Sequence, residues 1–262
     1  MGSSSKSSSS FKRSRERFPL ENANMKYSLL LVGFFACSQA VSPPPQSPVA
    51  DPNQIIAADL NGDGIDEIAA IKGSTLTWSG GTHELTGSLL QYRVGRMSSA
   101  VHESVLLVTG RSRTQPSSKP TILLLEKSGV TPLYIGSSIS ERITDARIHP
   151  KGVFVTRVAE GKKAEGAWLK QGTFEVETDS IMGLQQVPLV DGRIAVGRLY
   201  GDQPREPGSL EIHQEGKPPI QLATLRGVRT LEAVDLDQDG IEDLVVADGW
   251  HYKYGELGRA RL

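Results

Sequence analysis

Residues 55–71 of this 262-residue chain read IIAADLNGDGIDEIAAI, and residues 231–247 read LEAVDLDQDGIEDLVVA. In both stretches an acidic, glycine-containing segment separates two short apolar runs. Short apolar runs on either side of a turn signal are typical of buried β-strands joined by a hairpin loop. The two stretches therefore predict the same strand–loop–strand unit, and their first aspartates, Asp59 and Asp235, lie 176 positions apart.

The acidic segment has the composition of a calcium-binding loop. Oxygen-bearing side chains stand at positions 1, 3, 5 and 9 of nine residues, and Gly64 or Gly240 stands at position 6. Such a loop curls so that alternate side chains converge on one point, the glycine takes the bend at positive φ, and the carbonyl of position 7 turns inward. The first loop carries four acidic residues and the second carries five, so their mutual repulsion favours a hard cation.

The same spacing also opens an EF-hand, which has to be distinguished from these loops. An EF-hand needs a bidentate Glu at position 12 and a helix on each side. Position 12 is Ala70 in the first loop and Val246 in the second, and the flanking runs are short and β-like. The EF-hand interpretation is therefore rejected. A dockerin-type pair is disfavoured as well, because the two loops are far apart in the sequence.

The strand that follows each acidic loop has weaker counterparts between the two loops. The matching apolar runs are Ile68–Ile71, Val105–Thr109, Val153–Val158, Ile194–Leu199 and Leu244–Ala247, at steps of 37, 48, 41 and 50 residues and a mean of 44. Further strands follow, so that each unit is a meander of three to four strands, and the units begin near residues 54, 96, 143, 186 and 230. Repeats of this length and make-up predict an all-β fold, a β-propeller of about five units. The last unit is incomplete, so the chain is a partial propeller, a truncated one, or has a different number of units.

The residues of the two stretches resemble a known family. An apolar strand, the pattern D-x-N-x-D-G-x-x-[DE] and a second apolar strand are similar to the FG-GAP (VCBS-type) repeat of integrin α-subunit propellers and many bacterial surface proteins. The resemblance implies a β-propeller that holds structural calcium at two sites, each in a loop joining the first two strands of a blade. The implied ligands are Asp59, Asn61, Asp63, the Ile65 carbonyl and Glu67, and then Asp235, Asp237, Asp239, the Ile241 carbonyl and Asp243. Glu67 departs from the more usual Asp at its position.

Composition and charge agree with an all-β chain and exclude several classes of protein. The sequence holds 27 Gly and 15 Pro with only 6% aromatic residues, which favours short strands and turns over long helices. A formal net charge of -1 leaves no field to attract nucleic acid. The single Cys excludes a disulfide framework and a multi-cysteine zinc site.

The first 53 residues are expected to lie outside the folded region. Residues 1–24 are Ser-rich and basic and are predicted to be disordered, and residues 25–40 resemble a signal peptide, with either Met1 or Met25 as the true start. Cleavage follows Ala40, or Cys37 is lipidated as in a bacterial lipobox. Residues 41–53 form a Pro-rich linker before the propeller of residues 54–262. The expected location is therefore secreted or envelope-anchored, at the outer membrane, in the periplasm or on the cell surface, with membrane contact only through the lipid.

No catalytic motif is found in the sequence, and the main functional hypothesis is a non-catalytic binding or adhesion module rather than an enzyme. Its partner would be an unidentified protein or glycan of the cell envelope. Trp250, Tyr252 and Tyr254 form a candidate ligand-binding cluster, with packing between blades as the alternative. Two rival hypotheses remain: an enzyme or enzyme subunit that acts on envelope polysaccharide, and a truncated propeller without independent function.

Overall fold

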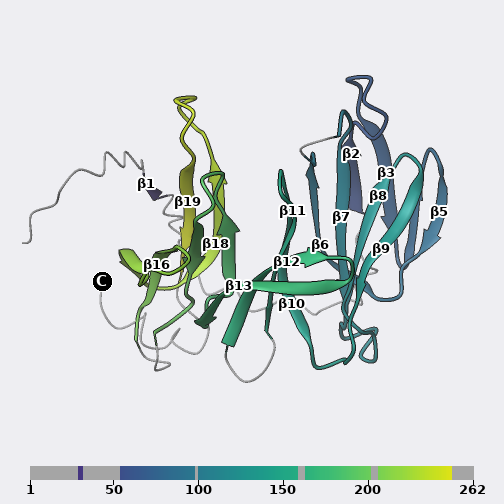
Figure 1. Ribbon diagram of the computed structural model, residues 1–262. Helices are drawn as coiled ribbons and strands as arrows, with labels where there is room; N and C mark the ends of the chain where they lie inside the picture. The colour runs from purple at the N-terminus through teal and green to yellow at the C-terminus, as the bar shows by residue number, and fades with distance from the viewer. Residues whose placement is uncertain (1–28, 32–53, 98–99, 159–162, 202–205, 250–262) are drawn as a thin grey trace, which may run out of the picture.

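The protein is described by a computed structural model, in which residues 29–31, 54–97, 100–158, 163–201 and 206–249 have a defined placement. These residues form 19 strands and no helix, so the prediction of an all-β fold is confirmed for this part of the chain (Figure 1). The same residues contain no helix with the length and apolarity needed to cross a bilayer.

The strands form five sheets, and apart from β1 the sheets follow one another along the sequence. The first sheet contains β2 (Gln54–Ala58), β3 (Glu67–Lys72), β4 (Thr75–Trp78) and β5 (Gly81–Glu84). The second contains β6 (Ser88–Gly95), β7 (Ser104–Gly110), β8 (Thr121–Glu126) and β9 (Gly129–Ile135). The third contains β10 (Arg142–His149), β11 (Gly152–Val158), β12 (Lys163–Lys170) and β13 (Thr173–Ile181). The fourth contains β14 (Gln185–Pro188), β15 (Ile194–Gly197), β16 (Gly208–His213) and β17 (Ile220–Leu225).

The fifth sheet has three strands in the described part of the chain. The antiparallel pair β18 (Val228–Val234) and β19 (Asp243–Asp248) is joined by β1 (Leu29–Leu31), which runs parallel to β19. In each of the first four sheets every neighbouring pair is antiparallel and consecutive in the sequence, which makes four simple meanders. Hairpin connections of this kind need only short turns, in agreement with the high Gly and Pro content.

The expected strands are present, but the second sheet begins earlier than the sequence suggested. Its first strand, β6, starts at Ser88, whereas the repeat pattern placed the start of that unit near residue 96. β6 reads SLLQYRVG, and its residues alternate between partly buried and exposed. The polar Gln91 and Arg93 interrupt its apolar pattern because they pair with charged groups of other sheets. A strand of this composition gives no continuous apolar run to detect.

The sheets pack face to face, and the strands in the middle of the stack are buried on both faces. All seven residues of β7 are buried. Val105 and Leu107 face the first sheet, and the intervening Leu106 and Val108 face the third. This alternation is the period of two that side chains follow along a strand. Burial of each such side chain contributes about 1.5–3 kcal/mol.

The remaining interfaces are built in the same manner. Phe154 of β11 packs against Val196 of β15 between the third and fourth sheets, with Trp168 at its edge. Leu210 of β16 packs with Leu231 of β18 between the fourth and fifth sheets. Trp168 is therefore a packing residue, and so is Trp78 in the first interface.

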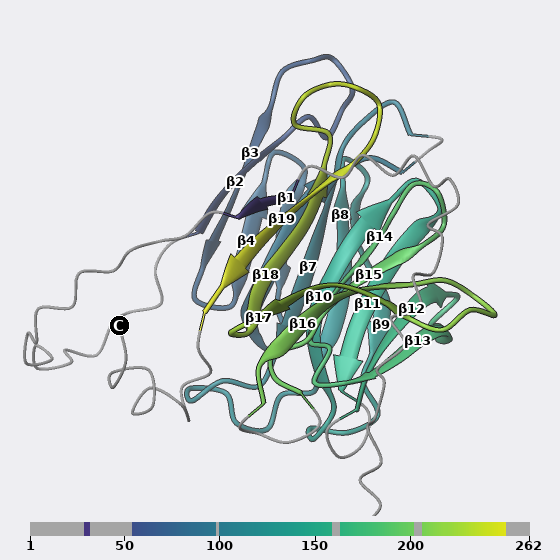
Figure 2. The same cartoon turned by 90° about the vertical axis from the view of Figure 1, so that its left-hand side faces the viewer.

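The first strands of the later sheets lie next to one another. β10 contacts β6 and β14, and β14 contacts β18. Figure 1 shows the fifth sheet on the left and the first sheet on the right, with β10–β13 between them, and Figure 2 shows the same strands from the side. These contacts bring β6, β10 and β18, which are distant in the sequence, to one central region.

The outer face of the first sheet is exposed. Ile55 and Ile68 point away from the second sheet and are 66% and 56% exposed.

Candidate metal sites

The two acidic loops occupy the same place in their sheets. The first loop joins β2 to β3, which are the first two strands of the first sheet. The second loop joins β18 to β19, which follow the three-residue strand β1 in the fifth sheet. The strand register is also the same, because Ala58 pairs with Glu67 and Val234 pairs with Asp243. Position 9 of each loop is thus the first residue of the returning strand, directly opposite the residue before position 1.

In the first loop the side chains hold the backbone in a tight coil. Asp59 is 5% exposed, and its carboxylate accepts hydrogen bonds from the N–H groups of Gly62 (2.7 Å) and Gly64 (3.1 Å). Asp63 accepts from the N–H of Ile65 at 2.8 Å. Glu67 Oε2 accepts from the N–H of Leu60 at 2.8 Å, which closes the loop across its neck.

Most of these hydrogen bonds recur in the second loop. The bond from position 4 does not, whereas the bond from position 5, which the N–H of Asp63 also donates to Asp59 at 3.1 Å, does. Asp235 accepts from the N–H groups of Asp239 (3.1 Å) and Gly240 (2.9 Å), and Asp239 accepts from the N–H of Ile241 at 2.8 Å. Asp243 accepts from the N–H of Leu236 at 3.1 Å, as Glu67 does at the equivalent place. The longer side chain of Glu67 therefore reaches the same backbone partner as an Asp.

Positive φ angles recur at the fourth and sixth positions of both loops. Gly62 and Gly64 have φ of 78° and 85°, and Gln238 and Gly240 have φ of 61° and 84°. No atom lies within 4 Å of the place that a Cβ would take on Gly64 or Gly240. The glycine at position 6 is therefore required by the backbone angle and not by lack of space.

The second loop brings three carboxylates together. One oxygen each from Asp235, Asp237 and Asp239 lies within 4.8 Å of the other two, and this is the one such acidic group in the described residues. Calcium binds oxygen ligands at 2.3–2.6 Å, so two ligands on one ion lie at most roughly 5 Å apart. The three carboxylates are therefore close enough to share one cation. Asp237 and Asp239 are exposed, which gives an ion access from solvent.

The first loop differs in one residue that changes its chemistry. Asn61 stands where the second loop has Asp237, and its Nδ2 donates to Glu67 and, at 3.0 Å, to Asp63. Its Oδ1 accepts from the N–H of Asp63 at 2.8 Å. The amide thus donates hydrogen bonds to carboxylate oxygens that a cation would otherwise bind.

Two residues beside the first loop were not anticipated from the sequence. Glu103 accepts from the N–H of Asp59 at 3.1 Å, and Arg96 lies 3.8 Å from the Asp59 carboxylate and 3.9 Å from Glu103. Both residues belong to the connection between β6 and β7. They carry no motif, and only the packing of the second sheet against the first brings them to the loop.

The corresponding connections of the third and fourth sheets lack the acidic pattern. β10 and β11 are joined by only Pro150 and Lys151. The connection between β14 and β15 contains Asp191, which pairs with Arg193 at 2.7 Å. Among the described residues the loop geometry therefore occurs in the first and fifth sheets only.

The other predicted site residues lie outside the described part of the chain. These are Cys37 and the aromatic cluster of Trp250, Tyr252 and Tyr254. Of the side chains assigned as position 7, Ile65 is 71% exposed and Ile241 is 43% exposed, so neither packs in the core.

Comparison with known proteins gives no assignment of family: no family model matches the chain, and no curated protein is similar to it.

Proposed function

We propose that the protein is a calcium-stabilised β-propeller of the FG-GAP type, and that it acts as a non-catalytic binding module at the cell envelope. The observation that supports this proposal is the equivalence of the two acidic loops. They share strand register, backbone angles and the hydrogen bonds of positions 1, 5 and 9, although 176 residues separate them. Two independent acidic turns would have no reason to agree in all of these.

Calcium would act on the folded state rather than on a reaction. Three carboxylates within 4.8 Å repel one another by about 1 kcal/mol per pair in a water-like environment. A bound calcium ion would replace this repulsion by attraction and would link the end of β18 to the start of β19. The fifth sheet packs on the fourth through Leu210 and Leu231. The free energy of calcium binding is therefore expected to stabilise the whole stack of sheets against unfolding.

The test is thermal unfolding of the full chain in excess calcium and then in EDTA. We expect the melting temperature to rise with calcium, and Asp239→Ala to remove most of that rise while changing the EDTA value little. Asp179→Ala is the matched control, since Asp179 is an exposed acid that pairs with Lys163 at 2.9 Å, far from the loops in the sequence. A melting temperature that is the same in calcium and EDTA would refute the proposal.

A further inference from the structure

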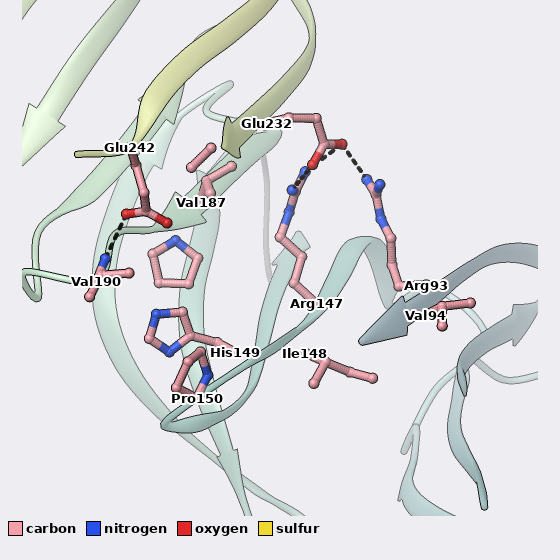
Figure 3. Close-up of a pocket in the computed structure, with 12 residues that line it drawn as sticks. Arg93, Val94, Arg147, Ile148, His149, Pro150, Val187, Val190, Glu232 and Glu242 are labelled. Atoms are coloured by element: carbon pink, nitrogen blue, oxygen red, sulfur yellow. Dashed lines mark hydrogen bonds and ion pairs between the residues drawn. The ribbon is translucent and has the colours of Figure 1, made fainter. Parts of the chain in front are cut away.

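Two cavities in the described part of the protein differ in how their charged groups are used. One, of about 390 Å³, lies where the first strands of four sheets meet. In Figure 3, Arg93 and Arg147 both point to Glu232, with which each forms an ion pair. On the other side of this cavity Glu242 accepts from the N–H of Val190 at 2.8 Å. Both arginines are therefore already paired with a carboxylate of the chain, and neither offers a free charge to a ligand.

The other cavity, of about 680 Å³, lies between the edge strands of the first and second sheets. β4 and β5 have four residues each, whereas β8 and β9 have six and seven, so the first sheet covers only part of the second. The uncovered part of β8 and β9 forms one wall of the cavity and contributes Thr121, Leu123, Pro132 and Ile135. The volume is in the range of sites for small ligands, roughly 300–1,000 Å³.

The connection between β7 and β8, residues 111–120, supplies a second wall through residues 115–119. This connection is folded back on itself by hydrogen bonds. Ser112 Oγ accepts from the N–H of Gln115 at 3.1 Å, and the carbonyl of Gln115 accepts from the N–H groups of Ser112 (3.2 Å) and Ser118 (3.4 Å). The wall is therefore formed by the chain itself, which reduces the cost of ordering it when a ligand binds.

The lining presents apolar side chains to the solvent. Ile135 is 64% exposed, and Pro116 and Pro132 are exposed as well. Exposed apolar groups that share one concave surface are stabilised when a ligand removes them from water. Among the lining residues the imidazole of His83 is the one aromatic ring, so the cavity has no broad aromatic face on which a sugar could stack. These walls suit an alkyl chain.

Glu84 belongs to the lining, but its carboxylate is already engaged elsewhere. It accepts from Ser74 Oγ at 3.1 Å and from Thr75 Oγ1 at 2.7 Å, so each carboxylate oxygen has a donor. Glu84 stands opposite Thr75 in the sheet, whereas His83 stands opposite the buried Leu76. Since side chains alternate between the two faces of a strand, the Glu84 carboxylate lies on the face turned away from the second sheet. It therefore does not oppose an anion in the cavity at close range.

Lys119 is the one lysine or arginine of the lining, and its charge is free. Its side chain is exposed and has no hydrogen-bond or ion-pair partner among the described residues. Arg111 and Arg113 belong to the same connection and add to the positive charge on this side of the molecule. The cavity thus combines an apolar wall with a single unpaired cation, which is the complement of a carboxylate attached to an alkyl chain.

We infer that this cavity binds a free fatty acid, whose alkyl chain packs on Leu123, Pro132 and Ile135 and whose carboxylate pairs with Lys119. The inference goes beyond the proposed function, because it assigns a ligand to a site away from the acidic loops. No residue of either acidic loop lines the cavity, so binding does not require calcium.

The test is calorimetric titration of the full chain with ten-carbon probes that differ in the head group: decanoate, decanol and decylammonium. An exposed ion pair corresponds to an affinity ratio of up to about fivefold. We therefore expect decanoate to bind about three- to fivefold more tightly than decanol, and decylammonium to bind most weakly. Butyrate has the same carboxylate on a much shorter chain and should bind at least about tenfold more weakly than decanoate. Tighter binding of decanol or decylammonium, or no binding of decanoate, would overturn the inference.

The titrations are carried out in EDTA, so that calcium cannot contribute to binding. The calcium proposal is tested separately by melting, and either proposal can therefore fail while the other stands. N-acetyl-leucyl-leucine carries a carboxylate on an apolar peptide. If it bound more tightly than decanoate, the site would belong to a peptide carboxyl terminus and the inference would be wrong.

Two substitutions separate pairing of the head group from packing of the chain. Lys119→Met removes the ammonium group but keeps an aliphatic stem, so the affinity for decanoate should fall to that for decanol, while the affinity for decanol stays the same. Lys127→Met is the matched control, because Lys127 is exposed in the turn between β8 and β9 and does not line the cavity. Ile135→Ser should weaken decanoate and decanol equally, by about three- to tenfold, with Ile220→Ser at a 52% exposed position as its control. The melting temperature of each variant checks its folding, and an unchanged affinity for decanoate in Lys119→Met or in Ile135→Ser would also overturn the inference.

Discussion

At the scale of single residues, the two acidic loops differ in chemistry at position 3, which is Asn61 in the first loop. Its equivalent in the second loop, Asp237, contributes a carboxylate to the group of three acids. Asn61 instead donates its amide N–H groups to Asp63 and Glu67. A neutral donor lowers the repulsion within the first loop, and it also reduces the negative charge available to an ion. The first loop should therefore depend less on calcium than the second.

This difference predicts opposite effects of Asn61→Asp in two buffers. In EDTA the variant loses the two donated hydrogen bonds and adds a charge, which should lower the free energy of unfolding by about 1–2 kcal/mol. In calcium the added ligand should recover that loss, so that the rise in melting temperature between EDTA and calcium becomes larger than in the wild type. Differential scanning calorimetry measures both values. A rise no larger than in the wild type would show that the first loop does not bind calcium.

At the scale of one strand, β16 carries a group whose titration should be visible. Glu211 is held between His213 at 3.0 Å, Ser209 at 2.6 Å and Arg198 at 3.4 Å. The hydrogen bond from His213 is the main cause that lowers the pKa of Glu211 from 4.5 to about 2, against the opposing effect of burial. A lowered folded-state pKa stabilises the protein fully above pH 4.5, and this stabilisation is lost as the pH falls toward 2.

The prediction is that wild type and Glu211→Gln differ most in stability near pH 6 and converge as the pH approaches 2. The difference near pH 6 should be about 2 kcal/mol, since the side chain is only 12% exposed. Urea unfolding at several pH values measures it. Glu175→Gln serves as control, because that acid is 55% exposed and its loss should change stability little at any pH. A difference that stays constant with pH would mean that Glu211 acts by packing alone.

The elements also show how far the sequence could predict the fold. Strands that are buried on both faces, such as β7 and β8, were evident because continuous apolar runs admit few other structures. β5 reads GTHE and β6 carries Gln91 and Arg93, so neither has an apolar pattern. Which face each strand turns to which neighbour depends on contacts between sheets. A local pattern does not contain that information.

The same limit applies to the candidate sites. The ten ligand positions of the acidic loops could be proposed because each set lies within nine consecutive residues. The ion-pair network of Arg93, Arg147 and Glu232 could not, since Arg93 and Glu232 are 139 positions apart in the sequence. Only the meeting of β6, β10 and β18 makes them one site.

At the scale of the whole molecule, the ion pairs of Arg147 connect parts that are not neighbours in the order of the sheets. Arg147 stands on the third sheet, and its partners Glu232 and Leu231 stand on the fifth. Arg93 of the second sheet also reaches Glu232. The fourth sheet comes between the third and the fifth in the sequence. These contacts therefore restrain the stack across its centre, in addition to the apolar interfaces between consecutive sheets.

Removal of Arg147 should consequently weaken the whole stack. Asp145 is 2% exposed, and without Arg147 its buried charge would lose its closest cation, since Arg93 lies 3.6 Å away and Arg147 only 2.5 Å. Removing one partner of a buried pair costs about 3–5 kcal/mol, so Arg147→Ala should lower the free energy of urea unfolding by that amount. Lys163→Ala, which breaks the exposed pair with Asp179, should change the free energy of unfolding little. Adding Asp145→Asn to Arg147→Ala should restore part of the loss, because the stranded charge is then gone. If the double variant were as unstable as Arg147→Ala alone, the loss of stability would come from the missing contact of Arg147 with the fifth sheet and not from the unpaired charge of Asp145.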